Sequence, residues 1–182
     1  MLGERFTEVL SAAQTGGEWA WHVLYRDLSG QLLGYVRAQR AVEPEDLVGE
    51  VFCDLARNIG TFTGDESSFR SWVFTIAHHR VIDERRYRSR RPNEPTDSPE
   101  EPSPAGDVEE EALASLISAE IQDLLARLTP DQRHVLLLRI LGGLTLEETA
   151  RVVGKRVGAV KALQHRGVIA LRKLLANRRV SL

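Results

Sequence analysis

The sequence of 182 residues is poor in cysteine and contains no long apolar run. Cys53 is the single cysteine, so neither an internal disulfide nor a metal cage built from cysteines is possible. No stretch approaches the about 18 consecutive apolar residues that a membrane-spanning helix requires, and the first residues lack a charged-then-apolar secretory signal. We therefore expect a cytoplasmic protein that does not insert into a membrane.

Charge of one sign is missing from two long segments. No lysine or arginine occurs between Arg91 and Arg127, and residues 92–111 hold eight acidic residues and five of the seven prolines. From Ala150 to Leu182, in contrast, there are nine lysines and arginines and no acidic residue. The formal net charge of −2 is therefore the sum of −8 from residues 92–111 and +6 from the rest of the chain. A binding partner responds to the local electrostatic potential rather than to the net charge, and a uniformly basic surface is suited to binding phosphates.

Apolar residues recur at helical spacing almost throughout, and few segments alternate as a strand would. The predicted helices cover residues 4–14, 18–41, 44 to about 58–60, and a segment from a cap at Ser67 or Ser68 to about Arg91. Residues 92–107 are too rich in proline to sustain a helix and should be flexible and partly extended. We expect an all-α fold with two small helical domains, residues 1–91 and 112–182, joined by a flexible acidic linker over residues 92–111.

The second half begins with signals for several helices. Capping boxes at "TPDQ" and "TLEE" place helix starts after Thr129 and Thr145. The helix before them carries the apolar stripe Leu113, Ile117, Ile121, Leu124 and Leu128.

The strongest local motif is "LTLEETARVVGKRVGAVKALQHRGVIALRKLL". Gly154 suits a left-handed turn between two helices. Val157, Val160 and Leu163 lie where the second helix would contact the first. This spacing predicts a helix-turn-helix, although any helical hairpin with a glycine in its turn would share it. The run of basic residues without an acid favours the DNA-binding version.

A second basic concentration lies at the end of the long helix. Six arginines fall within residues 80–91, and upstream "SFRSWVF" places Arg70 among three aromatic rings. Phe69 belongs to a sufficient core stripe, whereas Trp72 and Phe74 point away from the centre of that stripe. Aromatic faces beside arginines suit unpaired bases, which stack while the phosphates are neutralised. Aromatic residues in a small helical domain also serve as core, and this segment leaves both interpretations open.

Catalytic and metal sites have little support. His78 and His79 are adjacent, so their rings leave a helix about 100° apart and do not share a metal as residues one turn apart would. Cys53 follows Phe52 and should be a small, partly buried hydrophobe. There is no phosphate-binding glycine loop and no serine elbow. We expect neither an enzyme nor a cofactor.

Three motifs in this order resemble a bacterial sigma factor of the extracytoplasmic-function (ECF, group four) type, in the sigma-70 superfamily. They are "EPEDLVGEVFCDL", "SSFRSWVFTIAHHRVIDERRYRSRR" and "LTPDQRHVLLLRILGGLTLEETARVVGKRVGAVKALQHRGVIALRKLL". The resemblance implies a promoter-recognition subunit of RNA polymerase, with region two up to about residue 91 and region four from about 112 to 178. The implied partners are core RNA polymerase, promoter DNA as duplex and as melted non-template strand, and an anti-sigma factor that releases the protein in response to a signal.

The resemblance also implies functional residues. Polymerase docking falls on Asp46, Leu47, Glu50 and Phe52. Recognition of the minus-ten element falls on Phe62, Ser68, Phe69, Arg70, Trp72, Arg80, Arg85 and Arg86. Recognition of the minus-thirty-five element falls on Arg156, Lys161, His165 and Arg166. Ala162 and Leu163 stand where many relatives carry a serine and a basic residue.

Two other classes fit parts of the sequence. A free-standing helix-turn-helix transcriptional regulator would bind duplex DNA without polymerase, but it usually dimerises, and no long heptad seam is present. A helical adaptor that binds only protein would leave the basic ends as solvated faces, and the basic run without an acid argues against it. Binding of duplex promoter DNA with and without core polymerase separates these classes.

Overall fold

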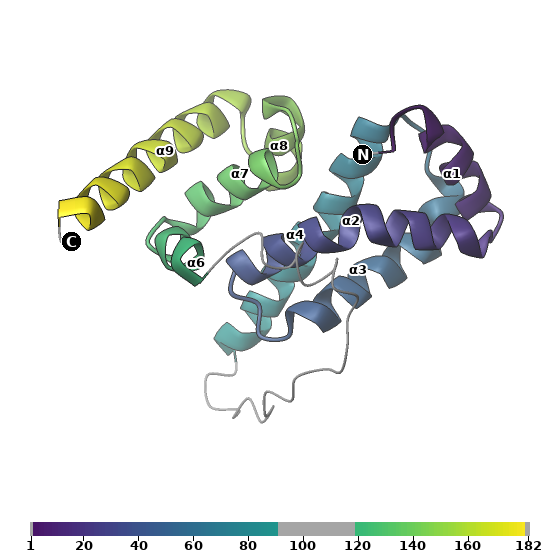
Figure 1. The fold of residues 1–182 in the computed structure, drawn as a ribbon, viewed down its shortest axis with the longest axis horizontal. Coiled ribbons are helices and arrows are strands. Elements are labelled where there is room, and N and C mark those ends of the chain that lie inside the picture. Colours follow the sequence, from purple (N-terminus) through teal and green to yellow (C-terminus); the bar gives the residue numbers. More distant parts are fainter. Residues whose placement is uncertain (1, 91–118, 181–182) are drawn as a thin grey trace.

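The computed structural model describes residues 2–90 and 119–180, and within them every regular element is a helix (Figure 1). The predicted all-α class is therefore confirmed for the described part of the chain. The expected linker over residues 92–111 lies outside it, as do Leu113 and Ile117 of the predicted apolar stripe.

The N-terminal half follows the predicted helix order. It contains η1 (Gly3–Arg5), α1 (Phe6–Gln14), α2 (Glu18–Ala38), α3 (Pro44–Asn58), η2 (Ile59–Thr61) and α4 (Glu66–Arg90). α2 ends before the predicted residue 41, because Arg40 adopts a left-handed conformation with φ of 64°. Asp65 caps α4 in place of the predicted Ser67 or Ser68. Its Oδ1 accepts the backbone N–H of Ser68 at 2.8 Å. Hydrogen bonds from the side chain and then the backbone of Ser68 lower the pKa of Asp65.

The core of this half lies between α2, α3 and α4. Leu24, Leu28 and Leu32 form the buried stripe of α2 at four-residue spacing. Phe74 is fully buried, so the prediction that it points away from the core is wrong. The reason is that α4 packs against α2 and α3 and also against α8, and a helix covered on more than one side buries more than one stripe. Trp72 is half-buried.

The C-terminal half contains α6 (Ala119–Ala126), α7 (Pro130–Ile140), α8 (Leu146–Val153) and α9 (Val157–Val180). Both predicted capping boxes are present, with Thr129 and Gln132 at the start of α7 and Thr145 and Glu148 at the start of α8. Ile121 of the predicted stripe is 44% exposed, so the buried face of α6 is carried by the leucines that follow it.

α8 and α9 form the predicted helix-turn-helix. Gly154 ends α8 with φ of 64°, the left-handed value that its position required. Val160 is fully buried against Val135 and Ala150, and Leu163 packs on the same cluster. Val157, the first residue of α9, is 38% exposed, which corrects its predicted role as a buried contact.

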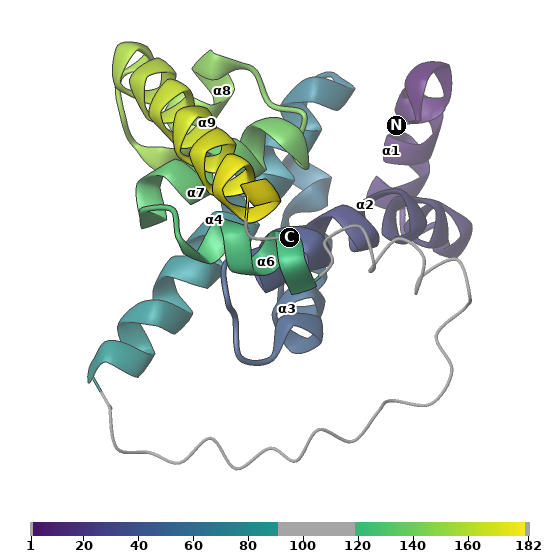
Figure 2. The same ribbon diagram turned by 60° about the vertical axis from the view of Figure 1, so that its left-hand side comes forward.

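The two halves pack against each other (Figures 1 and 2). α8 lies against α4, and α6 and α7 lie against α2. One apolar cluster extends from α2 and α4 into α7, and buried polar groups lie beside it. The Tyr35 hydroxyl of α2 bonds Nδ1 of His78 on α4 and Nδ1 of His134 on α7, both at 3.1 Å. In this conformation the two predicted helical domains are therefore in contact.

Candidate polymerase and nucleic-acid interfaces

The residues implied in polymerase docking divide between the surface and the core of α3. Asp46 and Glu50 are exposed, one helical turn apart. Phe52 is half-buried, with its ring 4.9 Å from that of Tyr25 on α2. Leu47 is only 7% exposed and belongs to the core, which leaves it almost no surface for a partner in this conformation.

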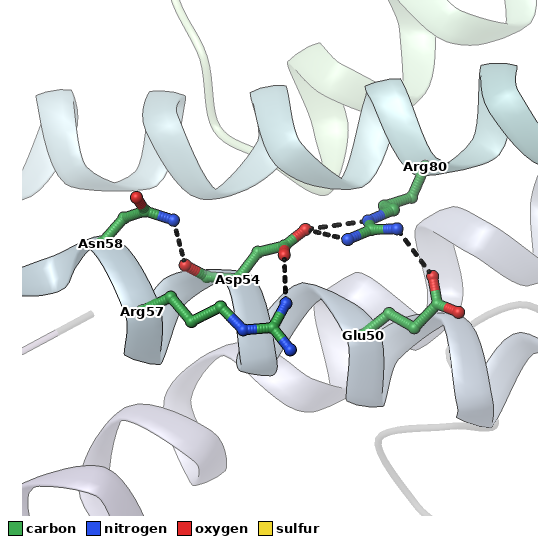
Figure 3. Close-up of polar contacts among 5 residues, drawn as sticks. All are labelled: Glu50, Asp54, Arg57, Asn58 and Arg80. Carbon is green, nitrogen blue, oxygen red and sulfur yellow. Dashed lines mark hydrogen bonds and ion pairs between the residues drawn. The ribbon is translucent and has the colours of Figure 1, made fainter.

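Arg80 joins α3 to α4 (Figure 3). Its Nε and Nη2 donate to Oδ2 of Asp54 at 2.8 and 2.5 Å, and its Nη1 lies 3.2 Å from Oε2 of Glu50. The bond to Asp54 raises the pKa of the Arg80 guanidinium, and the same carboxylate accepts from Arg57 at 3.3 Å. Arg80, which the sequence analysis assigned to minus-ten recognition, is therefore paired directly with Glu50, which it assigned to polymerase docking.

Asp54 was not predicted as a functional residue. It follows Asp46 and Glu50 at four-residue spacing, so all three carboxylates line one side of α3. The four-residue spacing is visible in the sequence and indicates that Asp54 lies on the same side of the helix as Asp46 and Glu50. The partner of this acidic line could not be read there, because Arg80 is separated from Asp54 by 26 residues.

The aromatic residues near the loop between α3 and α4 form one connected group. Phe62 stacks on Trp72 at 5.1 Å between ring centroids, with 16° between the planes. It also meets Phe69 edge-on at 5.3 Å, and Phe69 contacts Phe6 of α1 at 5.5 Å. Phe62 and Trp72 are half-buried, whereas Phe69 is 2% exposed. The accessible aromatic surface is therefore that of Phe62 and Trp72, and the buried Phe69 packs against both rings.

Arg70 is buried at the boundary between the two halves. It is 6% exposed, pairs with Asp27 at 3.4 Å and donates to the side chain of Gln31. Its Nε also lies 3.4 Å from the carbonyl oxygen of Gly142, on the loop before α8. In this conformation its guanidinium is turned toward protein rather than toward a DNA backbone. Asp27 and Gln31 were not predicted at any site, since neither stands near a motif.

The other predicted minus-ten residues are more accessible. Ser68 and Arg86 are exposed, and Arg86 pairs with Asp83 at 3.5 Å. Arg85 is partly buried. Burial lowers the pKa of His78 and of His134, and the charge of Arg85 lowers both further.

All four residues predicted for minus-thirty-five recognition are exposed. Arg156 lies in the turn before α9, and Lys161, His165 and Arg166 project from α9 itself. Arg166 Nε lies 3.3 Å from the carbonyl oxygen of Ala162 on the same helix. The second helix of a helix-turn-helix, with cations exposed near its N-terminus, has the geometry of helices that lie in the major groove of DNA.

The described residues contain neither a metal site nor a membrane-spanning helix. No group of three or more histidine, cysteine or acidic side chains within residues 2–90 and 119–180 is placed to hold a metal ion. Among the same residues, no helix has the length and apolar character to cross a bilayer. Cys53 is exposed, which corrects the expectation of a partly buried thiol.

The described residues thus form two helical halves, and the second contains a helix-turn-helix with exposed cations on α9. Residues 24–91 match the family model for sigma-70 region 2, and residues 118–171 match the model for sigma-70 region 4. The chain is 38% identical to the ECF RNA polymerase sigma factor BldN of Streptomyces coelicolor over 182 residues, which cover 95% of this chain and 67% of BldN.

Two further similarities agree with this. The chain is 39% identical over 134 residues to the ECF RNA polymerase sigma factor ShbA of Streptomyces griseus, with coverage of 71% and 70%. The solved structure of CnrH in complex with the cytosolic domain of CnrY shares the fold, with a TM-score of 0.63, 23% identity and coverage of 93% and 96%. The chain belongs to the ECF family of RNA polymerase sigma factors. It is therefore a transcription initiation factor whose region four is the DNA-binding helix-turn-helix.

Proposed function

We propose that this sigma factor divides promoter recognition between its two halves. Region four reads the minus-thirty-five element as duplex, with Arg156, Lys161, His165 and Arg166 along the start of α9. Region two holds the melted minus-ten strand on Phe62 and Trp72. The observation that carries this proposal is the contrast between the two surfaces. α9 offers exposed cations, whereas Phe62 in the loop before α4 and Trp72 on α4 offer half-buried stacked rings.

Docking on core polymerase is assigned to the exposed part of α3. Asp46, Glu50 and the half-buried ring of Phe52 are available there, and Leu47 supports them from the core. Because Glu50 is also paired with Arg80, docking and the position of α4 are physically coupled.

We further propose that the protein is released from an anti-sigma factor in response to a signal, as is common in this family. CnrH, whose fold this chain shares, forms a complex with the cytosolic domain of CnrY, so the fold accommodates a protein partner.

Two sets of alanine variants test the division of labour with core polymerase present. Lys161→Ala and Arg166→Ala should weaken binding to duplex promoter, and each lost phosphate contact should reduce the salt slope by about one. Trp72→Ala and Phe62→Ala should spare duplex binding by region four and weaken binding of a minus-ten single strand, by about 1–3 kcal/mol for each lost stack. Arg26→Ala, which removes an exposed charge from α2, is the control.

A template that is already melted separates the two roles. It should rescue the α9 variants, because it bypasses duplex capture, and should not rescue the aromatic variants. Equal failure of both sets on both templates would show that the two surfaces do not act as separate readers.

A further inference from the structure

Helix α1 holds the loop between α3 and α4, although the match to sigma-70 region 2 begins only at residue 24. Gln14 is the last residue of α1. Its Nε2 donates to the carbonyl oxygen of Ile59 at 3.0 Å and to that of Phe62 at 2.8 Å. These carbonyls stand at the beginning of η2 and just after its end. A primary amide nitrogen carries two hydrogens, so one side chain fixes both ends of this turn.

A second contact ties the other end of the loop to the same N-terminal segment. The Glu66 carboxylate, in the first turn of α4, accepts the backbone N–H groups of Leu2 at 2.6 Å and Gly3 at 3.0 Å. Beside it, the ring of Phe6 packs on Phe69. The loop therefore leaves α3 and enters α4 under restraint from residues that precede the matched region.

The contacts of the N-terminal segment with the loop fix the position of Phe62. Its carbonyl is held by Gln14, and its ring stacks on Trp72. Moving the carbonyl would carry the ring with it and change the face that the pair offers. A Cβ added at Gly64 would lie 3.1 Å from the Phe62 ring, so the loop backbone closes one side of that ring.

We propose that Gln14 is a positioning residue for minus-ten recognition: it clamps the turn and thereby sets the surface that an unpaired base meets. This inference rests on the proposed role of Phe62 and Trp72. The clamp requires a donor with the reach of glutamine. Glutamate has the same length, but when ionised it offers only acceptors to two carbonyl oxygens. Methionine keeps much of the volume and offers no donor.

The first test measures base preference with the full chain and core polymerase. Single-stranded minus-ten oligonucleotides carry each of the four bases at each position in turn. Gln14→Met and Gln14→Glu should reduce the strongest base preference about fivefold, which corresponds to about 1 kcal/mol. Affinity for core and binding of minus-thirty-five duplex should not change. Glu8→Met, which places the same side chain at an exposed position of α1, should keep the wild-type preference.

The second test needs neither DNA nor polymerase. With 5-fluorotryptophan in the free protein, the ¹⁹F signal of Trp72 should shift or broaden in both Gln14 variants, whereas those of Trp19 and Trp21 should not. An unchanged Trp72 signal, or an unchanged base preference in folded variants, would overturn the proposal. Variants that unfold would overturn it as well, since Gln14 would then be purely structural. If the wild type shows no base preference but Trp72 responds, the proposed minus-ten role fails while the clamp itself stands.

Discussion

The aromatic side chains of α4 have different roles because they differ in burial. Phe74 is fully buried and meets Tyr35 edge-on at 5.7 Å, and Phe69 is nearly as enclosed. Trp72 keeps an accessible part and shares a stack with Phe62. Hydrophobic character alone therefore does not identify the residues available to a base.

Replacing Phe74 should reveal its contribution to the core. Phe74→Ala should lower the free energy of unfolding by about 3–5 kcal/mol, because it removes a ring and leaves a cavity between α2 and α4. Urea denaturation followed by far-UV circular dichroism measures this. Ile140→Ala is the control: its side chain is 70% exposed and should change stability by no more than about 0.5 kcal/mol. A loss below about 1 kcal/mol for Phe74→Ala would contradict the assigned burial.

Two glycines of the helix-turn-helix differ in their backbone conformation, so they should respond differently to substitution by alanine. Gly154 has a left-handed backbone between α8 and α9, whereas Gly158 lies in the first turn of α9 with open space where a Cβ would be. The same substitution should therefore act with opposite sign at two positions separated by one helical turn.

Gly154→Ala should destabilise the chain by about 1–2 kcal/mol, since an L-residue disfavours the left-handed conformation. Gly158→Ala should stabilise it by about 0.5–1 kcal/mol by removing a flexible residue from a helix. Chemical denaturation of both variants gives the two signs. Destabilisation by both would mean that space around α9, rather than backbone conformation, limits this motif.

α3 has a buried face toward α2 and α4 and an exposed acidic face. Asp46→Arg reverses one charge on the exposed face, so it should abolish co-purification with core polymerase and leave the circular dichroism spectrum unchanged. Glu8→Arg, an equal charge change on α1, should not affect co-purification. Retention of Asp46→Arg by core at the wild-type level would place the docking surface elsewhere. Leu47 is unsuitable for this test, because a charge at a buried position would unfold the helix.

The packing of the two halves buries titratable groups. His78 and His134 are 8% and 3% exposed, with ring centroids 4.6 Å apart. His134 Nδ1 also lies 3.0 Å from Nε2 of Gln39, and Tyr35 contacts both histidines. Burial lowers the pKa of His78 to about 4, and the charges of His79 and Arg85 act in the same direction. Burial also lowers the pKa of His134 to about 3, assisted by His78 and Arg85. Both rings are therefore neutral while the halves are packed.

Acid should weaken this packing. Separated halves expose the histidines, which then titrate near pH 6.5, whereas the packed halves resist protonation until about pH 4. The packed state thus keeps its full stability above about pH 6.5 and loses about 1 kcal/mol per histidine for each pH unit below it. Small-angle X-ray scattering should detect an increased radius of gyration between pH 7.5 and 5.5.

Variants identify the groups responsible for that response. The double variant His78→Gln/His134→Gln should lose the pH dependence, because neither amide titrates in this range. His165→Gln, at an exposed position of α9, should keep it. A radius of gyration that is constant with pH in the wild type, or a full response in the double variant, would contradict the role given to the two histidines.

Much of the fold could be predicted because its signals are local. Proline at the start of α3, the capping boxes at Thr129 and Thr145, and Gly154 at the turn each act through neighbouring backbone groups. The cations of α9 were predictable for the same reason, since a residue on the outer face of a helix stays exposed. The cap at Asp65 was missed because aspartate and serine compete for that position on nearly equal terms.

The helices, their order, the helix-turn-helix and the separation of acidic from basic segments follow from the sequence alone, because they depend on spacing and composition along the chain. Packing between helices, in contrast, places Arg70 against Asp27 and Gly142. It also joins α3 to α4 through Arg80 and holds the loop at Phe62 through Gln14. These contacts join residues 26 or more positions apart. Their formation depends on how several helices bury their faces together, and no local pattern encodes that choice.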